Sequence, residues 1–313
     1  MAGRKQGENA GRSLAVEPPS RADSAGAASR AERREEVGGA SRAGNAGEAG
    51  LGHEAKRRPV RASSAGGRRL GSTRAAAAFD RAGLIRALDD GLTGLGLSIP
   101  AFQREQLIDY LALLSRWNAV YNLTAVRDPD AMLVHHLLDS LAIVQPLAAR
   151  GPFGSVVDVG SGGGLPGVVL AIVWPEAFVH LVEPVGKKAA FLRQCASELA
   201  LTGLRVHATK IESLAGRREF EADLIVCRAF ASLRDFVAGL GGLVGPATIV
   251  AAMKGRLPND EIASLPDDWR VQQVLPLDVP RLGAERHLLL LERVDGRGET
   301  RSPPCDRNSA STH

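Results

Sequence analysis

The chain of 313 residues is 44% apolar with a formal net charge of +4 at pH 7, and it contains no run of about 18 apolar residues, which excludes a transmembrane helix. The basic pair Arg4 and Lys5 is not followed by the apolar segment that a secretory signal needs. Cys195, Cys227 and Cys305 are odd in number and widely spaced, which favours a reducing compartment; we expect a soluble cytoplasmic protein with no metal and no membrane partner.

The first 78 residues differ from the rest in composition and charge. They contain no Phe, Trp, Tyr or Ile and hold 15 Lys+Arg against 8 Asp+Glu, which leaves 24 and 27 for the remainder. Because such a segment cannot bury enough apolar surface to offset chain entropy, residues 1–78 are predicted to form a disordered basic extension. A basic arm can add salt-sensitive affinity for nucleic acid. A solvated tail, or a start site assigned too far upstream, fits the composition equally well.

Residues 79–150 are predicted to form a small helical unit. Helical spacing of apolar residues covers 80–92 and 101–118. Asp128, followed by proline, is typical of a helix start in which the aspartate caps and the proline takes the first helical position. This third helix should end near Pro146, because proline interrupts a helix.

From residue 151 to 294, short apolar runs alternate with helical patterns, which is the layout of βαβ units around a mainly parallel sheet. Strands are expected near 155–159, 178–183, 205–209, 222–227, 247–252, 270–276 and 286–293. Helices are expected near 165–174, 186–201, 231–243 and 258–264, the second of them ended by Gly203. Seven strands that close with an antiparallel hairpin are typical of Rossmann-like methyltransferases. Residues 295–313 are predicted to be a disordered tail.

A glycine-dense turn follows the first predicted strand, where residues 155–167 read Ser-Val-Val-Asp-Val-Gly-Ser-Gly-Gly-Gly-Leu-Pro-Gly. Glycines let the backbone turn tightly and approach a ligand that a Cβ would push away. Glu183 ends the next apolar run about 20 residues downstream, where nucleotide-binding α/β folds place the acid that accepts from ribose hydroxyls. Gly160, Gly162, Gly164 and Glu183 therefore predict a nucleoside-bearing cofactor.

Three further side chains lie at predicted strand ends beside that cofactor. Asp158 can accept from the amino group of S-adenosylmethionine, or it can bond within the turn. Ile211 and Glu212 follow the third strand, where an adenine ring would lie, although Glu212 can equally begin a solvated turn.

The fourth predicted strand ends in Arg228, and ligands of such sheets meet the carboxyl ends of the strands. The (Asp/Asn)-Pro-Pro-aromatic motif of exocyclic amine methylation is absent there, and Cys227 continues an apolar strand, which favours a buried, inert thiol. A ring nitrogen with its own lone pair, such as guanine N7, remains as the nucleophile and needs no general base. Alignment alone can supply about 7–11 kcal/mol, and Arg228 can hold the guanine edge or a nearby phosphate.

His135, His136 and Asp139 share one helical face before the sheet. The sequence shows no further metal ligand nearby, so a packed pair that joins the helical unit to the sheet is favoured over a substrate role. Basic side chains also follow the second and fifth strands, where they form either a phosphate track or ordinary solvated surface. These side chains are Lys187, Lys188, Arg193 and Lys254.

Several motifs of the chain occur together in a fixed order. They are Asn122-Leu-Thr-Ala-Val-Arg-Asp-Pro129, His136-Leu-Leu-Asp-Ser140, the Gly-rich turn, Gly186-Lys-Lys188, Phe191-Leu-Arg193, Arg228-Ala-Phe-Ala-Ser232, Met253-Lys-Gly255 and Gly283-Ala-Glu-Arg-His287. This combination resembles the small-subunit ribosomal RNA guanine-N7 methyltransferase family, also called glucose-inhibited division protein B, over about residues 80–294. The family often has Pro at Gly163 and a basic residue at His135.

The resemblance implies S-adenosylmethionine as cofactor, with contacts at Gly160, Leu165, Ile211 and Glu212, and a cofactor or substrate contact at Arg228. It also implies a guanine of 16S ribosomal RNA near the decoding region as target, in naked RNA or in the small ribosomal subunit. We expect a monomer. A small-molecule methyltransferase and a non-catalytic, RNA-associated cofactor-binding protein remain as alternatives.

Overall fold

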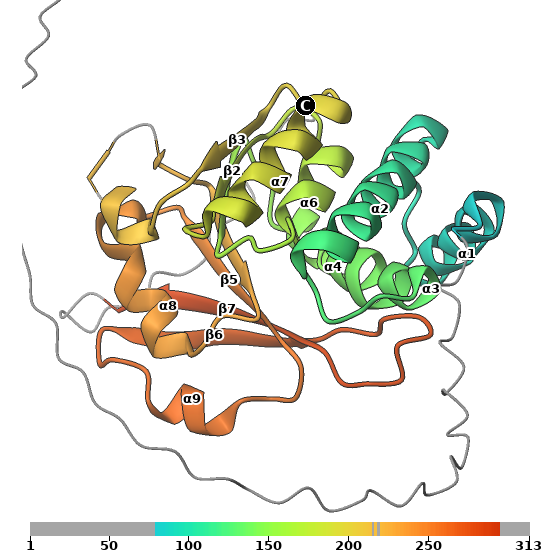
Figure 1. Ribbon diagram of the computed structural model, residues 1–313. Coiled ribbons are helices and arrows are strands. Elements are labelled where there is room, and N and C mark those ends of the chain that lie inside the picture. The colour runs from blue at the N-terminus through green and yellow to red at the C-terminus, as the bar shows by residue number, and fades with distance from the viewer. Residues whose placement is uncertain (1–78, 215, 218–219, 295–313) are drawn as a thin grey trace, which may run out of the picture. The chain divides into compact units, whose positions relative to one another are not determined.

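The computed structural model describes residues 79–214, 216–217 and 220–294 (Figure 1). The predicted extensions 1–78 and 295–313 lie outside these residues. The described part contains one seven-stranded sheet with helices on both faces, as the alternation of strand and helix patterns predicts.

The sheet has the strand order β3-β2-β1-β4-β5-β7-β6. The strands are β1 (Ser155–Val159), β2 (Phe178–Val182), β3 (Leu204–His207), β4 (Leu224–Arg228), β5 (Ile249–Lys254), β6 (Trp269–Pro276) and β7 (His287–Arg293). The first five strands pair in parallel, and β7 is antiparallel to both β5 and β6. The predicted seven-stranded sheet with a closing hairpin is therefore confirmed. All five parallel strands end at one edge, which gathers the residues that follow them.

Helices surround the sheet and precede it. They are α1 (Arg81–Gly94), α2 (Ala101–Tyr121), α3 (Pro129–Met132), α4 (Asp139–Leu141), α5 (Val144–Ala148), α6 (Gly167–Val173), α7 (Gly186–Glu198), α8 (Leu233–Leu240) and α9 (Asn259–Ala263). A π-helical segment, η1 (Leu133–Leu138), joins α3 to α4, and 3₁₀ turns η2 (Ile211–Leu214) and η4 (Gly241–Leu243) follow β3 and α8. Asp80 and Asp128 cap α1 and α3 by accepting from the backbone N–H three residues on.

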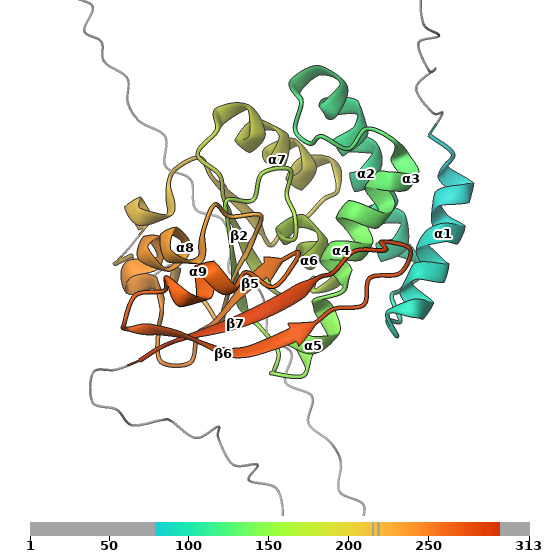
Figure 2. The same cartoon turned by 90° about the horizontal axis from the view of Figure 1, so that it is seen from below.

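Alternation along the strands builds two hydrophobic cores. Val156 and Val226 point into the core shared with α6, α7 and the helices of 81–148, whereas Val157 and Ile225 point into the core beneath α8. Residues 79–150 therefore form no independent core of their own but share one with the sheet. Figure 2 shows the connection between β6 and β7 reaching α1, where a Cβ on Gly94 would lie 2.8 Å from Pro280.

Two predicted helix ends are wrong. Pro146 does not end a helix but lies in the first turn of α5, where no intrahelical N–H bond is lost. Gly203 does not cap α7, which ends at Glu198 and is followed by Ala200 at φ +51°. Gly203 instead packs closely against the backbone just before β2, since a Cβ there would lie 2.7 Å from the carbonyl oxygen of Ala177.

One described segment, Pro129–Ala148, is long and apolar enough to cross a membrane by length and composition alone, although Asp130 and Asp139 interrupt its apolar residues. Of its most apolar window, 72% is buried inside the protein. Leu133, Leu137 and Leu141 are enclosed in the core under α2 and α6. The apolar character of this segment is explained by core packing.

Candidate active site

The Gly-rich turn after β1 adopts left-handed backbone at three positions. Gly160, Gly162 and Gly164 have φ values of +70°, +57° and +90°, a region that side chains with a Cβ rarely enter. The three glycines differ in their surroundings. A Cβ on Gly164 would lie 2.5 Å from Val168 Cγ2, whereas a Cβ on Gly162 would have only its own turn within reach, at 3.8 Å from Gly160 O. Gly164 is required by packing, and Gly162 leaves open space beside the backbone.

Glu183 lies directly beside this turn. Its Oε2 accepts from Gly162 N at 2.8 Å and its Oε1 accepts from Val185 N at 2.8 Å, and the residue is only 3% exposed. Its backbone N donates to His207 O, which ties the ends of β2 and β3 together. The predicted juxtaposition of acid and glycines is therefore present. Each carboxylate oxygen keeps a second lone pair, which a ribose hydroxyl can use.

Asp158 does not stand where the sequence interpretation put it. The residue is 0% exposed, and its Oδ2 accepts from Gly167 N at 3.0 Å beneath the turn. Its Oδ1 is buried and has no hydrogen-bond partner. Burial raises the pKa of this carboxyl from 3.8 to about 7. An enclosed side chain cannot meet a cofactor at the surface, so the alternative of an acid bonded within the turn is the one observed.

The remaining predicted cofactor contacts surround the same edge. Ile211 begins η2 after β3 and is buried against α8, where a Cβ on Gly239 would lie 2.8 Å from its Cγ2. Glu212 is exposed beside it, and Leu165 is buried at the end of the turn. Tyr110 of α2 supports the turn from outside, since its hydroxyl donates to Gly163 O at 2.6 Å. The helical unit therefore helps to shape this site, which the sequence interpretation missed.

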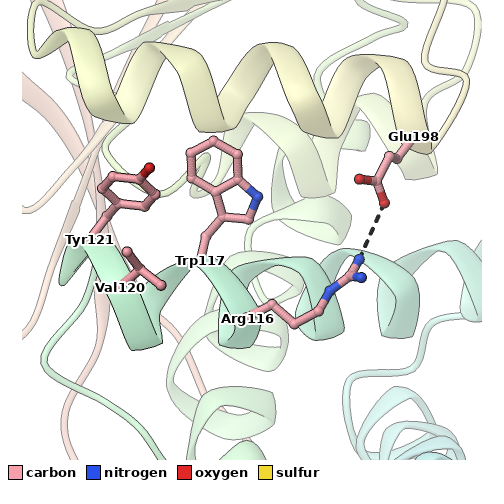
Figure 3. Close-up of a pocket in the computed structure, with 5 residues that line it drawn as sticks. All are labelled: Arg116, Trp117, Val120, Tyr121 and Glu198. Atoms are coloured by element: carbon pink, nitrogen blue, oxygen red, sulfur yellow. Dashed lines mark hydrogen bonds and ion pairs between the residues drawn. The ribbon is translucent and has the colours of Figure 1, made fainter.

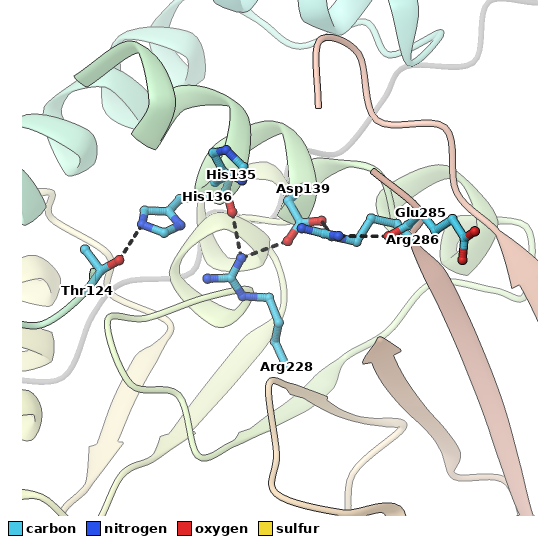
Figure 4. A network of polar contacts seen from close by, with 7 residues as sticks. All are labelled: Thr124, His135, His136, Asp139, Arg228, Glu285 and Arg286. Carbon is cyan, nitrogen blue, oxygen red and sulfur yellow. Dashed lines mark hydrogen bonds and ion pairs between the residues drawn. The ribbon is translucent and has the colours of Figure 1, made fainter. Parts of the chain in front are cut away.

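Arg228, the last residue of β4, is tied to the helix before the sheet (Figure 4). Its Nη1 donates to His135 O and to Asp139 Oδ2, both at 2.9 Å. Asp139 Oδ1 accepts from Arg286 Nε at 2.8 Å. One buried carboxylate therefore joins η1 and α4 to β4 and to the loop before β7. The predicted joining role of Asp139 is confirmed, whereas Arg286 was missed because charge alone did not distinguish it among 39 Lys+Arg.

His136 lies beside this network without bonding to it. Its Nε2 lies 2.9 Å from Thr124 Oγ1, and its Nδ1 is buried without a partner. Burial, reinforced by the charge of Arg228, lowers the pKa of this imidazole from 6.5 to about 4. His136 is therefore neutral at pH 7 and packs the helical unit onto the site, as the preferred interpretation of the sequence holds.

The predicted phosphate track is only partly assembled. Lys187, Lys188 and Arg193 lie on α7, and Lys187 Nζ donates to Tyr121 O at 3.1 Å. Lys254 does not belong with them, because its side chain is only 10% exposed and its Nζ lies 2.8 Å from Glu261 Oε2. A buried ammonium group that is already paired with a carboxylate is poorly accessible to a phosphate, and its charge is largely compensated.

Two cysteines within the described residues are free and buried. Burial raises the pKa of the Cys227 thiol well above its ordinary value, so the predicted inert role holds. No group of three or more potential ligands that could hold a metal ion is present in the described part of the chain.

The strand order, the Gly-rich turn after β1 and the acid after β2 define the Rossmann-like class of S-adenosylmethionine-dependent methyltransferases. The model of one family, described as GidB, rRNA small subunit methyltransferase G, matches residues 103–289. The chain belongs to this family, which confirms the resemblance and supports neither alternative. It is therefore a methyltransferase with S-adenosylmethionine as cofactor.

Two similar sequences support the same assignment. The chain is 51% identical over 220 residues to ribosomal RNA small subunit methyltransferase G of Burkholderia lata, covering 70% of this chain and 96% of that one. It is 49% identical over 221 residues to the protein of the same name from Herminiimonas arsenicoxydans, covering 69% and 99%. A crystal structure of an MtNAS mutant in complex with S-adenosylmethionine has a TM-score of 0.44 at 18% identity, covering 69% and 93%.

Proposed function

We propose that this chain methylates N7 of a guanine in 16S ribosomal RNA, close to the decoding region, within the cytoplasm. The observation that carries the proposal is the juxtaposition of an open glycine turn, an acid bonded to it and an arginine at the end of β4, in a chain of the methyltransferase G family. The names of the relatives from Burkholderia lata and Herminiimonas arsenicoxydans, both at about half identity, support a ribosomal RNA substrate.

The glycine turn fits the methionine end of S-adenosylmethionine, because the space beside Gly162 is open where a Cβ would intrude. Glu183 would accept from the ribose hydroxyls with its remaining lone pairs. Leu165, Ile211 and Glu212 would enclose the adenosine and methionine portions. When bound, the cofactor supplies an electrophilic methyl group on a sulfonium sulfur. Asp158 is not among these cofactor contacts, because its side chain is enclosed beneath the turn.

The guanine N7 carries its own lone pair, so transfer needs alignment and no general base. Among the described residues, Arg228 makes both of its hydrogen bonds through Nη1, and its Nε and Nη2 can donate to a substrate. They would bond to guanine O6 or to a nearby phosphate. A bond to N7 would consume the attacking lone pair. Arg228 would therefore position the base while leaving N7 free.

Labelled S-adenosylmethionine, with small-subunit RNA or intact subunits from cells that lack this enzyme, tests the proposal. Reduction followed by aniline cleavage cuts the chain at 7-methylguanine. The expected result is one new cleavage near the decoding region. Label incorporated without cleavage would reject N7 as the acceptor, and no label on RNA or subunits would reject the RNA substrate.

A further inference from the structure

A shallow pocket lies between α2 and α7 (Figure 3), and no residue of the Gly-rich turn lines it. Its lining residues are Arg116, Trp117, Val120, Tyr121 and Glu198. Its volume of about 270 Å³ lies just below the range of about 300–1,000 Å³ that small-molecule sites occupy. The size therefore suits a single planar ring better than a whole cofactor. We call this pocket, with its five lining residues, the stacking groove.

The apolar wall of the stacking groove is exposed and ordered by its neighbours. Val120 is 69% exposed and Tyr121 is 42% exposed. The Trp117 ring centroid lies 5.1 Å from that of Tyr121 and 5.5 Å from that of Phe191. Exposed apolar side chains that stand together indicate a binding surface, whereas scattered ones do not. Trp117 lies between Tyr121 and Phe191, so little of its side-chain entropy remains to be lost when a flat ligand stacks there.

The charges around the stacking groove complement a phosphate chain. Helix α7 carries Lys187, Lys188 and Arg193 and one acid, Glu198. That acid already pairs with Arg116 at 3.3 Å at one end of the groove. At the other end Lys187 Nζ donates to Tyr121 O, which brings an ammonium ion next to the aromatic pair. Aromatic faces beside cations are the combination that binds single-stranded nucleic acid.

The stacking groove also connects to the methyltransferase site through α2. Tyr110 of the same helix donates to Gly163 O, and a Cβ on Gly163 would lie 3.4 Å from Leu114. Lys187 stands in the first turn of α7, just after the strand end that carries Glu183. An RNA strand that presents a guanine at the carboxyl edge of the sheet would therefore pass along this helix pair.

We propose that an unpaired base of the substrate RNA, flanking the methylated guanine, stacks on Tyr121 and Trp117, while an adjacent phosphate binds Lys187. This inference rests on the proposed function. It adds a binding site to the enzyme that is separate from the cofactor seat and from Arg228. Base–aromatic stacking is sequence-tolerant, because every base presents a flat face.

Tyr121→Ala tests the site, with Tyr121→Phe as the matched variant that keeps the ring. Phe102→Ala removes another exposed aromatic of α2, one that is 63% exposed and lies outside the groove. Affinity for a fluorescent single-stranded RNA oligonucleotide that contains the target guanine, KM for intact subunits and calorimetric affinity for S-adenosylmethionine are compared. Tyr121→Ala is expected to weaken RNA affinity and raise KM about 5- to 100-fold, with kcat and cofactor affinity unchanged. Both other variants should behave as wild type.

Two results would overturn the stacking site. The first is unchanged RNA affinity and KM in Tyr121→Ala. The second is a raised KM for intact subunits with unchanged affinity for the oligonucleotide, since the groove would then bind a ribosomal protein. Failure of the proposed function looks different, because the wild-type enzyme would itself leave guanine N7 unmethylated.

Discussion

The glycines in the turn after β1 are required for different reasons, which depend on the atoms around each one. Gly164 and Gly167 are packing positions, because a Cβ on Gly167 would lie 2.3 Å from Leu181 Cδ2 and 2.6 Å from Asp158 Oδ2. Gly162 has a positive φ but nothing of the protein near its Cβ position. Conformation and ligand approach, and not packing, therefore explain glycine at this position.

Gly162→Val should abolish binding of S-adenosylmethionine, because the side chain would occupy the space beside the turn. Left-handed backbone with a Cβ costs about 1–2 kcal/mol. Gly96→Val is the matched control, since Gly96 has φ +65° with its nearest atom at 3.9 Å, in the connection between α1 and α2. Calorimetry should show lost affinity for the first variant and wild-type affinity for the second, at comparable losses of thermal stability. Normal affinity in Gly162→Val would contradict the assignment.

Asp158 and His136 make opposite contributions to stability with pH. The folded-state pKa of Asp158 is raised from 3.8 to about 7, so the native state binds more protons between these values and loses stability as pH rises. The folded-state pKa of His136 is lowered from 6.5 to about 4, so its contribution is present above about pH 6.5 and is lost as pH falls towards 4. The two effects offset each other in the wild type over much of this range.

Asp158→Asn should therefore remove the loss of stability with rising pH that Asp158 causes, and leave the effect of His136. An amide oxygen can still accept from Gly167 N but does not ionise. Relative to the wild type, the free energy of unfolding of the variant should rise with pH by about 1 kcal/mol per unit between about pH 4 and 7. Urea unfolding at four pH values in this window gives the comparison. Parallel curves for the two proteins would show that Asp158 does not titrate there.

The helical unit and the sheet meet through one buried carboxylate. Asp139 pairs with Arg228 from β4 and with Arg286 from the loop before β7 (Figure 4). The π-helical segment η1 ends immediately before Asp139, and segments of this kind often occur at functional sites. Loss of one partner from such a group leaves charge uncompensated in a region with little water. The arrangement gives Arg228 a defined orientation at the strand end.

Arg228→Ala and Arg286→Ala separate positioning of substrate from stability. Each variant removes one ion pair of Asp139 and should lower the free energy of unfolding by a similar amount, up to about 3 kcal/mol. This is the low end of the range for buried pairs, because both arginine side chains keep about a fifth of their surface exposed. Only Arg228→Ala should lower RNA methylation, by at least about a hundredfold.

Single-turnover rates and chemical denaturation of both variants provide the measurement. If Arg228→Ala retains wild-type turnover, Arg228 is a structural residue and the proposed contact with the guanine is wrong. If both variants lose turnover equally, the ion pairs of Asp139 affect activity by maintaining the structure at the carboxyl edge of the sheet, and not through a contact of Arg228 with the guanine.

One of the two hydrophobic cores of the described residues starts at α1. Leu84, Leu88 and Leu92 of this helix are buried with the leucines of α2 and η1, and Asp80 caps its first turn. The family model begins at residue 103. The apolar clusters of the described residues therefore begin ahead of the segment that the family model matches.

A variant that lacks residues 1–78 should keep the thermal transition of the full chain and its affinity for S-adenosylmethionine. Removal of 15 basic against 8 acidic residues should, at most, flatten the dependence of RNA affinity on salt. Thermal unfolding and RNA binding at several salt concentrations test both expectations. A lower melting temperature in the shortened protein would show that the extension contributes to folding.

Local pattern was sufficient for the elements and for their order. Alternation, capping aspartates and the glycine turn predict the seven strands and the helices between them, because these signals depend on neighbours in the chain. The edge at which Arg228 and Glu183 lie follows from the same reasoning, since parallel strands end together. The helix ends near Pro146 and Gly203 were wrong, because proline fits a first turn and glycine also permits close contact between chain segments.

Contacts between distant segments were decided by tertiary structure alone. The enclosure of Asp158, the pairing of Lys254 with Glu261 and the link from Asp139 to Arg286 join residues whose burial and partners no local signal records. Charge and spacing define what a side chain can do, so the sequence by itself determined the fold class, the cofactor and the strand-end residues. Solvent access and pairing depend on how the helical unit closes over the sheet, and these decide which of those side chains remain available to a ligand.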